Sequence, residues 1–162
     1  MLIYDILKMD HRMIINIIDA ISTVKESNRR KHMLMLVDTE LTMHHKAEET
    51  VFYNTLRHFL PDEEMLRASF DEHDKIDSTL ATLQFSPADN SEWIATLGTL
   101  RTMLQQHMMK EETALFTLAQ KQFTTEEALE MGMHLLEEKG KLGMSNLFMV
   151  TSHKTKELAA DS

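Results

Sequence analysis

The hydrophobic residues of the chain recur every three or four positions, a spacing that places them on one face of a helix. Four such series follow one another, and they span residues 4–21, 34–51, 66–83 and 97–118. Short polar segments separate the series, and a further helix of about four turns is expected from Thr124 toward Gly140. The pattern therefore predicts an all-α fold, an up-down-up-down four-helix bundle with a short additional C-terminal helix.

Individual residues indicate where the helices should end. Pro61 disfavours helical geometry in the residue before it, so the second helix should end near Leu60. Two capping boxes, in which an N-cap side chain and a Glu three residues later bond to each other's backbone N–H groups, are expected at Asp89 with Glu92 and at Thr124 with Glu127. The bundle is accordingly predicted for residues 1–122, with residues 123–162 packing on it as a helix and tail.

A histidine occupies one core position in each of the four series. These residues are His11, His44, His73 and His107. Glu48 and Glu111 follow the second and fourth of them by four residues, which places each Glu on the same helix face as its histidine. The two His-x-x-x-Glu motifs are 63 residues apart and the other two histidines are 62 apart, so the chain has the pattern of a duplicated half.

These six side chains predict a metal centre. A single core histidine is usually an ordinary hydrogen-bonded residue, but here the distances from the turns bring four of them to nearly one level of the bundle. A buried carboxylate costs several kcal/mol without a positive partner, and no Lys or Arg falls on the core stripes at that level. Carboxylates from opposite helices, Glu48 and Glu111, favour two ions over one. The ligand set suits iron, manganese or zinc, with a hydroxide or oxide completing the charge balance.

Composition and charge restrict the other functions. The formal net charge of −9 argues against binding to nucleic acid or to an anionic membrane. The absence of cysteine excludes disulfides, thiolate catalysis and cysteine-ligated metals. No apolar run approaches the roughly 20 residues of a membrane span, and the first residues lack the basic segment and cleavage site of a secretion signal. We therefore expect a cytoplasmic protein, either a monomer or a homodimer.

The six residues and their spacing resemble the hemerythrin-like, or HHE cation-binding, domain family over about residues 4–120. The resemblance implies a non-haem di-iron centre with an oxo or hydroxo bridge, in which Glu48 and Glu111 bridge the ions and the four histidines are terminal ligands. It also implies that open positions on iron bind oxygen, nitric oxide or hydrogen peroxide. The motif is specific for the fold and the metal site, and less specific for the activity.

Two departures from the oxygen-carrying members of this family affect the expected function. Those carriers have a second histidine on the third helix, at the position of Asp77 here, so the irons should be more open in this chain. Their bridging acid on the fourth helix lies five residues after the histidine, an offset that falls on Glu112, which is kept as the alternative to Glu111. The more open centre favours reaction with peroxide or nitric oxide in oxidative or nitrosative stress, as a catalase-like or nitric-oxide-reducing activity.

Three other functions are compatible with the same residues. The centre carries or senses oxygen or nitric oxide reversibly, or it stores iron or stabilises the bundle, or it donates iron for the repair of iron–sulfur clusters. Repair is the weakest of these, because the family members that perform it carry a cysteine-bearing N-terminal segment and this chain has no cysteine.

Three polar residues beside the predicted ligands are not assigned to the metal. His45, Glu49 and Glu112 each follow a predicted ligand directly, and one residue turns the side chain by about 100° around an α-helix. We therefore expect them at the surface or behind the ligands.

Overall fold

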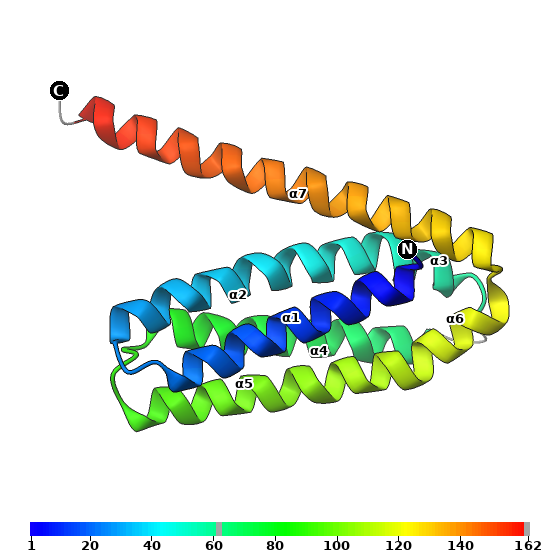
Figure 1. The fold of residues 1–162 in the computed structure, drawn as a ribbon, viewed down its shortest axis with the longest axis horizontal. Coiled ribbons are helices and arrows are strands. Elements are labelled where there is room, and N and C mark those ends of the chain that lie inside the picture. Colours follow the sequence, from blue (N-terminus) through cyan, green and yellow to red (C-terminus); the bar gives the residue numbers. More distant parts are fainter. Residues whose placement is uncertain (61–62, 161–162) are drawn as a thin grey trace.

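In the computed structural model, the described residues form four long helices that lie side by side and a fifth that runs back along them (Figure 1). The structure describes the backbone of residues 1–60 and 63–160 and the side chains of residues 1–60 and 63–144. The elements in chain order are α1 (Ile3–Thr23), α2 (Ser27–Ala47), η1 (Glu48–Tyr53), α3 (Asn54–Arg57), α4 (Glu64–Phe85), α5 (Ser91–Lys110), η2 (Glu111–Leu115), α6 (Phe116–Gln122) and α7 (Thr125–Ala160). The π-helical segments η1 and η2 continue α2 into α3 and α5 into α6 without a break.

The four-helix bundle predicted from the hydrophobic pattern is confirmed. The second long helix ends at Arg57, shortly before the expected Leu60. At the start of α5, Asn90 rather than Asp89 caps the helix, and its side chain accepts a hydrogen bond of 2.9 Å from the backbone N–H of Trp93. Asn90 has an extended backbone directly before the first helical turn, and an N-cap side chain reaches the third N–H of the helix from that position.

The capping box predicted at the start of the fifth helix is present. Thr124 donates its backbone N–H to Glu127 Oε2 at 2.7 Å, and Glu127 donates its backbone N–H to Thr124 Oγ1 at 3.2 Å. The helix that follows, α7, is much longer than expected, since it continues to Ala160. Gly140 does not end it, because one glycine among good helix formers costs only about 1 kcal/mol.

The first half of α7 packs against the bundle. Ala128, Met131 and Leu135 are buried there. Gly132 allows a close approach, because a Cβ atom at this position would lie 2.5 Å from the carbonyl oxygen of Met1. Toward its C-terminal end, α7 diverges from α2 (Figure 1). Side chains from residue 145 onward lie outside the described residues, so the packing expected for the tail stays a prediction.

The apolar core consists of two clusters with a polar layer between them. One cluster holds aromatic residues near the start of α1, including Phe52, Tyr53 and Phe116, and the other surrounds Trp93. On each long helix, the buried polar residues lie around the position where one cluster ends and the other begins. The layer in which the sequence predicts a metal centre is thus closed by apolar side chains from both sides.

None of the described helices combines the length and the apolar composition that are needed to cross a membrane.

Candidate metal centre

The structure brings all six predicted ligands together in the polar layer. Each is at most 3% exposed: His11, His44, Glu48, His73, His107 and Glu111. Their donor atoms fall into two groups, within each of which all of the atoms lie within 4.8 Å of one another. The first group contains His11, His44, Glu48 and Glu111, and the second contains His73, His107 and a residue that was not predicted, His45.

Glu48 lies between histidines of the two groups. Its Oε1 atom is 3.8 Å from Nε2 of His44, and its Oε2 atom is 3.4 Å from Nε2 of His73. On the opposite helix, Oε2 of Glu111 is 3.2 Å from Nε2 of His11. A carboxylate whose two oxygens face different histidines has the arrangement that a bridge between two ions requires.

The outward-facing Nδ1 atom of each predicted histidine lies beside a carboxylate from another helix. The Nδ1 to oxygen distances are 2.7 Å for His11 with Glu112, 3.3 Å for His44 with Asp10, 2.6 Å for His73 with Glu49 and 2.8 Å for His107 with Glu72. Each carboxylate accepts a hydrogen bond from the Nδ1–H group, so the Nε2 atom of the neutral ring keeps its lone pair. This Nε2 atom faces inward. Carboxylates commonly hold metal-binding histidines in this way.

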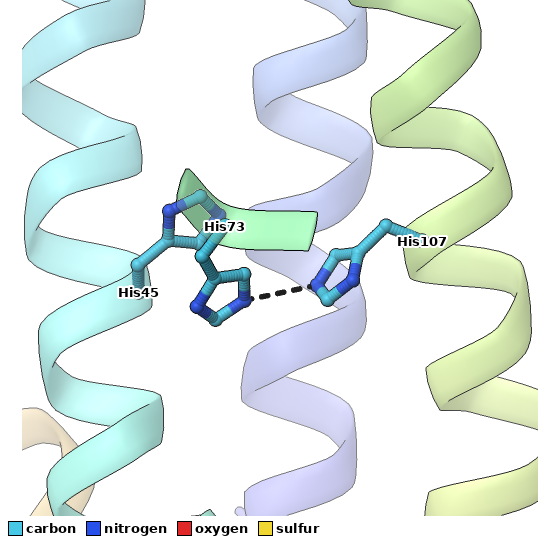
Figure 2. Close-up of side chains that lie close together, drawn as sticks. All are labelled: His45, His73 and His107. Atoms are coloured by element: carbon cyan, nitrogen blue, oxygen red, sulfur yellow. Dashed lines mark hydrogen bonds between the residues drawn. The ribbon is translucent and has the colours of Figure 1, made fainter. Parts of the chain in front are cut away.

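The Nε2 atoms of His73 and His107 require a cation near them. They are 3.1 Å apart (Figure 2), and each ring donates its Nδ1 proton to a glutamate. Two lone pairs at this distance repel each other unless a proton or a metal ion lies between them.

The carboxylates repeat the internal duplication. Asp10 and Glu72 are 62 residues apart and directly precede His11 and His73, and Glu49 and Glu112 are 63 apart and directly follow the two buried glutamates. The centre is therefore nearly two-fold symmetric in its outer contacts as well as in its predicted ligands.

Glu49 and Glu112 lie behind the predicted ligands, as expected, and π-helical turns contribute to their placement there. Both turns begin at a buried glutamate, Glu48 in η1 and Glu111 in η2. A π-turn holds more residues than an α-turn, so successive side chains are separated by less than the 100° of an α-helix. Each pair of adjacent glutamates can then face the layer, the first toward the centre and the second toward a histidine.

His45, which was expected at the surface or behind the ligands, is buried in the polar layer at 4% exposure. Helix α2 packs against both α1 and α4. Consecutive side chains on an α-helix point about 100° apart, which is close to the angle between the directions from α2 to its two neighbouring helices. His44 therefore faces Asp10 on α1, while His45 faces Asp77 on α4. The sequence contains the signal, since an adjacent His pair at a core position supplies donors to two neighbouring helices.

Burial controls the protonation of the histidines. Burial lowers the pKa of His44 to about 3, although the hydrogen bond with Asp10 opposes it, and lowers the pKa of His45 to about 4. Burial also lowers the pKa of His107. In His11 the effect of burial is outweighed by the neighbouring carboxylates of Glu111 and Glu112, of which Glu112 is hydrogen-bonded to Nδ1, so the pKa of His11 is raised.

The pKa values of the two central carboxylates are shifted in opposite directions. Burial and the negative charge of Glu111 raise the pKa of Glu48 well above its ordinary value. Burial opposes ionisation of Glu111 too, but the close contacts with Glu48 and His11 outweigh it and lower the pKa of Glu111. Positive ions beside the two carboxylates would offset their mutual repulsion.

Six buried donor atoms of the predicted ligands have no hydrogen-bond partner. They are Nε2 of His11, Nε2 of His44, and both carboxylate oxygens of Glu48 and of Glu111. Buried polar atoms without partners are rare because each costs free energy. Imidazole nitrogens and carboxylate oxygens are donors for iron, manganese and zinc, so these residues fit a pair of such ions.

A cavity of about 350 Å³ adjoins the centre at His11. Apolar atoms of Ile15 and Met108 contribute to its wall, and so does Glu112. A second cavity of about 280 Å³ borders His107 and contains Lys75 and Lys110. A small uncharged molecule is better suited to the first, whose wall is more apolar.

The chain is similar to known proteins in family and in fold. A family model described as Hemerythrin HHE cation binding domain matches residues 2–119. No curated protein matches the sequence significantly. Among solved structures, the fold is similar to that of a hemerythrin HHE cation binding domain-containing protein from Mycobacterium kansasii, with a TM-score of 0.82, 93% of each chain covered and 20% sequence identity.

Proposed function

We propose that the polar layer of this protein holds two iron ions and exposes them to a small oxidant. The chain belongs to the hemerythrin HHE cation-binding domain family, whose model matches residues 2–119. The observation that carries the proposal is the set of six unpartnered donor atoms of His11, His44, Glu48 and Glu111. Two divalent cations would satisfy these atoms and would also separate the lone pairs of His73 and His107. Manganese and zinc fit the same donors, so the identity of the ions belongs to the proposal.

One ion is assigned to His11 and His44 and the other to His73 and His107, with Glu48 and Glu111 bridging them. The positions of the two oxygens of Glu48, which face His44 and His73, support its role as a bridge. Glu112, the alternative to Glu111, is bonded to Nδ1 of His11. Its carboxylate is therefore engaged on the outer side of the ligand, which favours Glu111 as the second bridge.

When bound, two adjacent irons would supply electrons to dioxygen, nitric oxide or hydrogen peroxide. The residues of the chain hold the donors in place, and the carboxylates at Nδ1 raise the basicity of the histidines. The apolar side chains on both sides of the layer exclude bulk water. The cavity beside His11 offers a route for a small uncharged molecule, and this supports a reaction with peroxide or nitric oxide in oxidative or nitrosative stress.

Metal analysis combined with an optical spectrum tests the centre. Protein purified with iron should contain two irons per chain and show a charge-transfer band of bridged ferric ions. The variant His11→Ala should lose iron while the control His58→Ala, at an exposed position beyond the centre, should keep it. A single zinc per chain, or a metal-free protein whose thermal stability does not change when iron is added, would contradict the proposal.

Adding peroxide separates an enzyme from a carrier. An enzyme that decomposes peroxide releases one molecule of oxygen for every two of peroxide, repeatedly, and an enzyme that reduces nitric oxide consumes it in the presence of an electron donor. Repeated uptake and release of oxygen without oxidation of the iron would instead identify a reversible carrier or sensor. Iron that binds but undergoes none of these reactions would indicate storage or a structural site.

A further inference from the structure

His45 is a buried histidine with no place among the six proposed ligands. It is 4% exposed, and neither of its ring nitrogens has a hydrogen-bond partner. An imidazole in this condition has lost its contacts with water without gaining others, which destabilises the fold. The polar layer therefore contains one donor group more than the proposed centre uses.

The donor atoms of His45, His73 and His107 converge (Figure 2). One nitrogen from each ring lies within 4.8 Å of the other two. The 3.1 Å between Nε2 of His73 and Nε2 of His107 suits two nitrogens that bind one ion at right angles, because metal–nitrogen bonds are about 2.1 Å long. A nitrogen of His45, on α2, lies within 4.8 Å of these two nitrogens.

We infer that His45 is a seventh ligand, so that one ion has three histidines and the other has two. The inference rests on the proposed function, since it concerns the ion assigned to His73 and His107. It makes the two ions unequal even though the surrounding chain is nearly symmetric.

The surroundings of His45 match those of the other histidines. Each of the four has a carboxylate at Nδ1, and Nδ1 of His45 is 3.6 Å from Oδ1 of Asp77. That distance is too long for a hydrogen bond and short enough for a small rotation to close it. Asp77 would then hold His45 as Glu49 holds His73.

The present orientation of the ring requires one movement. The rings of His45 and His73 are stacked, with centroids 3.7 Å apart and planes at 11°. An ion lies in the plane of each imidazole that binds it, so His45 has to tilt away from this parallel arrangement. No hydrogen bond at its ring nitrogens holds it in place.

The duplicated positions show where the symmetry is broken. Met108 is the counterpart of His45, at an offset of 63 residues, and Ile15 is the counterpart of Asp77, at an offset of 62. Both line the cavity beside His11. His45 would thus close the ion of His73 and His107, whereas at the duplicated position the other ion would adjoin an apolar cavity. A small molecule should therefore reach the ion of His11 and His44.

Substitution of His45 tests the assignment in the full-length chain. The variant His45→Phe keeps an aromatic ring that can stack on His73 but removes both nitrogens. Titration of the metal-depleted protein with ferrous iron should show that one ion binds about tenfold more weakly, or worse, and that the other is unchanged. Mössbauer spectra of iron-loaded wild-type protein should show two different iron environments, and only one of them should change in the variant.

Two further variants serve as controls. Met108→Leu, at the duplicated position, should leave both affinities unchanged. His45→Gln provides a smaller polar side chain in case the phenylalanine variant does not fold, and it should weaken the same ion. Melting temperatures of the metal-depleted variants separate a loss of folding from a loss of a ligand.

Wild-type affinity for both ions in His45→Phe would overturn the inference and leave His45 as a stacking residue. A wild-type chain that binds one ion would instead overturn the dinuclear centre. The inference would then require that His45→Phe weakens this single ion.

Discussion

Lys139 of α7 donates hydrogen bonds to both carboxylate oxygens of Asp10, at 2.7 Å each, and Asp10 lies beside Nδ1 of His44. Burial raises the pKa of Asp10, but the hydrogen bonds with His44 and Lys139 outweigh it and lower the pKa. Helix α7 is thus connected to His44, a proposed ligand, through the charged side chain of Asp10. Lys110 has the corresponding contact with Glu72, at 2.8 Å, beside His107.

Removing Lys139 should weaken metal binding, although Lys139 is not itself a proposed ligand. In Lys139→Met, the carboxylate of Asp10 loses its positive partner, and we expect a loss of about 2 kcal/mol in stability and about tenfold in metal affinity. Lys141→Met is the control, because Lys141 is paired with Glu138 on the surface of the same helix. Equal affinities in the two variants, measured by titration with ferrous iron, would show that α7 does not influence His44.

Substitution of Glu72, the acid beside His107, should reduce metal affinity more than substitution of the preceding residue, Asp71. Glu72→Gln removes the charge that holds Nδ1 of His107, so metal affinity should fall by about 10-fold to 100-fold. Asp71→Asn removes the same charge from an exposed position one residue earlier and should have little effect. If both substitutions reduce affinity equally, the effect reflects the net charge of the protein rather than the orientation of His107.

Glu48→Gln should stabilise the metal-depleted protein and prevent the binding of two ions. Glu48 is fully buried, and burial together with the charge of Glu111 raises its pKa well above the ordinary value. A neutral amide of the same size removes that repulsion, so the melting temperature without metal should rise by about 2–4 °C. Metal analysis of the variant should find fewer than two ions per chain. A variant that still binds two ions would show that Glu48 is not a bridge.

The metal-depleted protein should lose stability as the pH falls below 6.5. Burial lowers the folded-state pKa of His44 to about 3 and that of His45 to about 4, against 6.5 for an unburied histidine. The unfolded chain then binds protons that the folded protein does not, so stability rises with pH between those values and 6.5. Glu48 opposes part of this above pH 4.5, because its raised pKa makes the folded protein bind the extra proton.

A net difference of one proton corresponds to a slope on the order of 1.4 kcal/mol per pH unit. Urea denaturation at pH 5, 6 and 7 measures this slope of stability against pH, and His45→Phe should reduce the slope. A flat profile in wild-type protein would show that His44 and His45 titrate normally. Binding of metal should change the profile, since metal competes with protons for the same nitrogens.

The bundle and the meeting of six side chains could be predicted because both depend on spacing along regular helices. The four apolar series specify which faces are buried, and a histidine on each face must then enter the core. Equal distances from the turns bring His11 and His44 to one level. Nothing beyond α-helical geometry and antiparallel packing was needed for this part.

The finer placement of residues around the ligands depends on features that regular geometry omits. Glu49 and Glu112 contact the Nδ1 atoms of two histidines from π-turns at the buried glutamates, and the sequence of those turns does not distinguish them from an α-helix. His45 was missed because α2 has two buried faces rather than one. Lys139 belongs to a helix whose length and position the apolar pattern did not specify.

The four bonds between histidine and carboxylate form a closed ring, since each joins a different pair of neighbouring long helices. No single helix can leave the bundle without breaking two of them and separating the donors of at least one ion. The proposed ions should therefore dissociate by opening of the tertiary structure rather than by movement of a single side chain. The exchange rate of bound iron for a second isotope should then follow the rate of that opening, and should increase when α7 is loosened at Lys139.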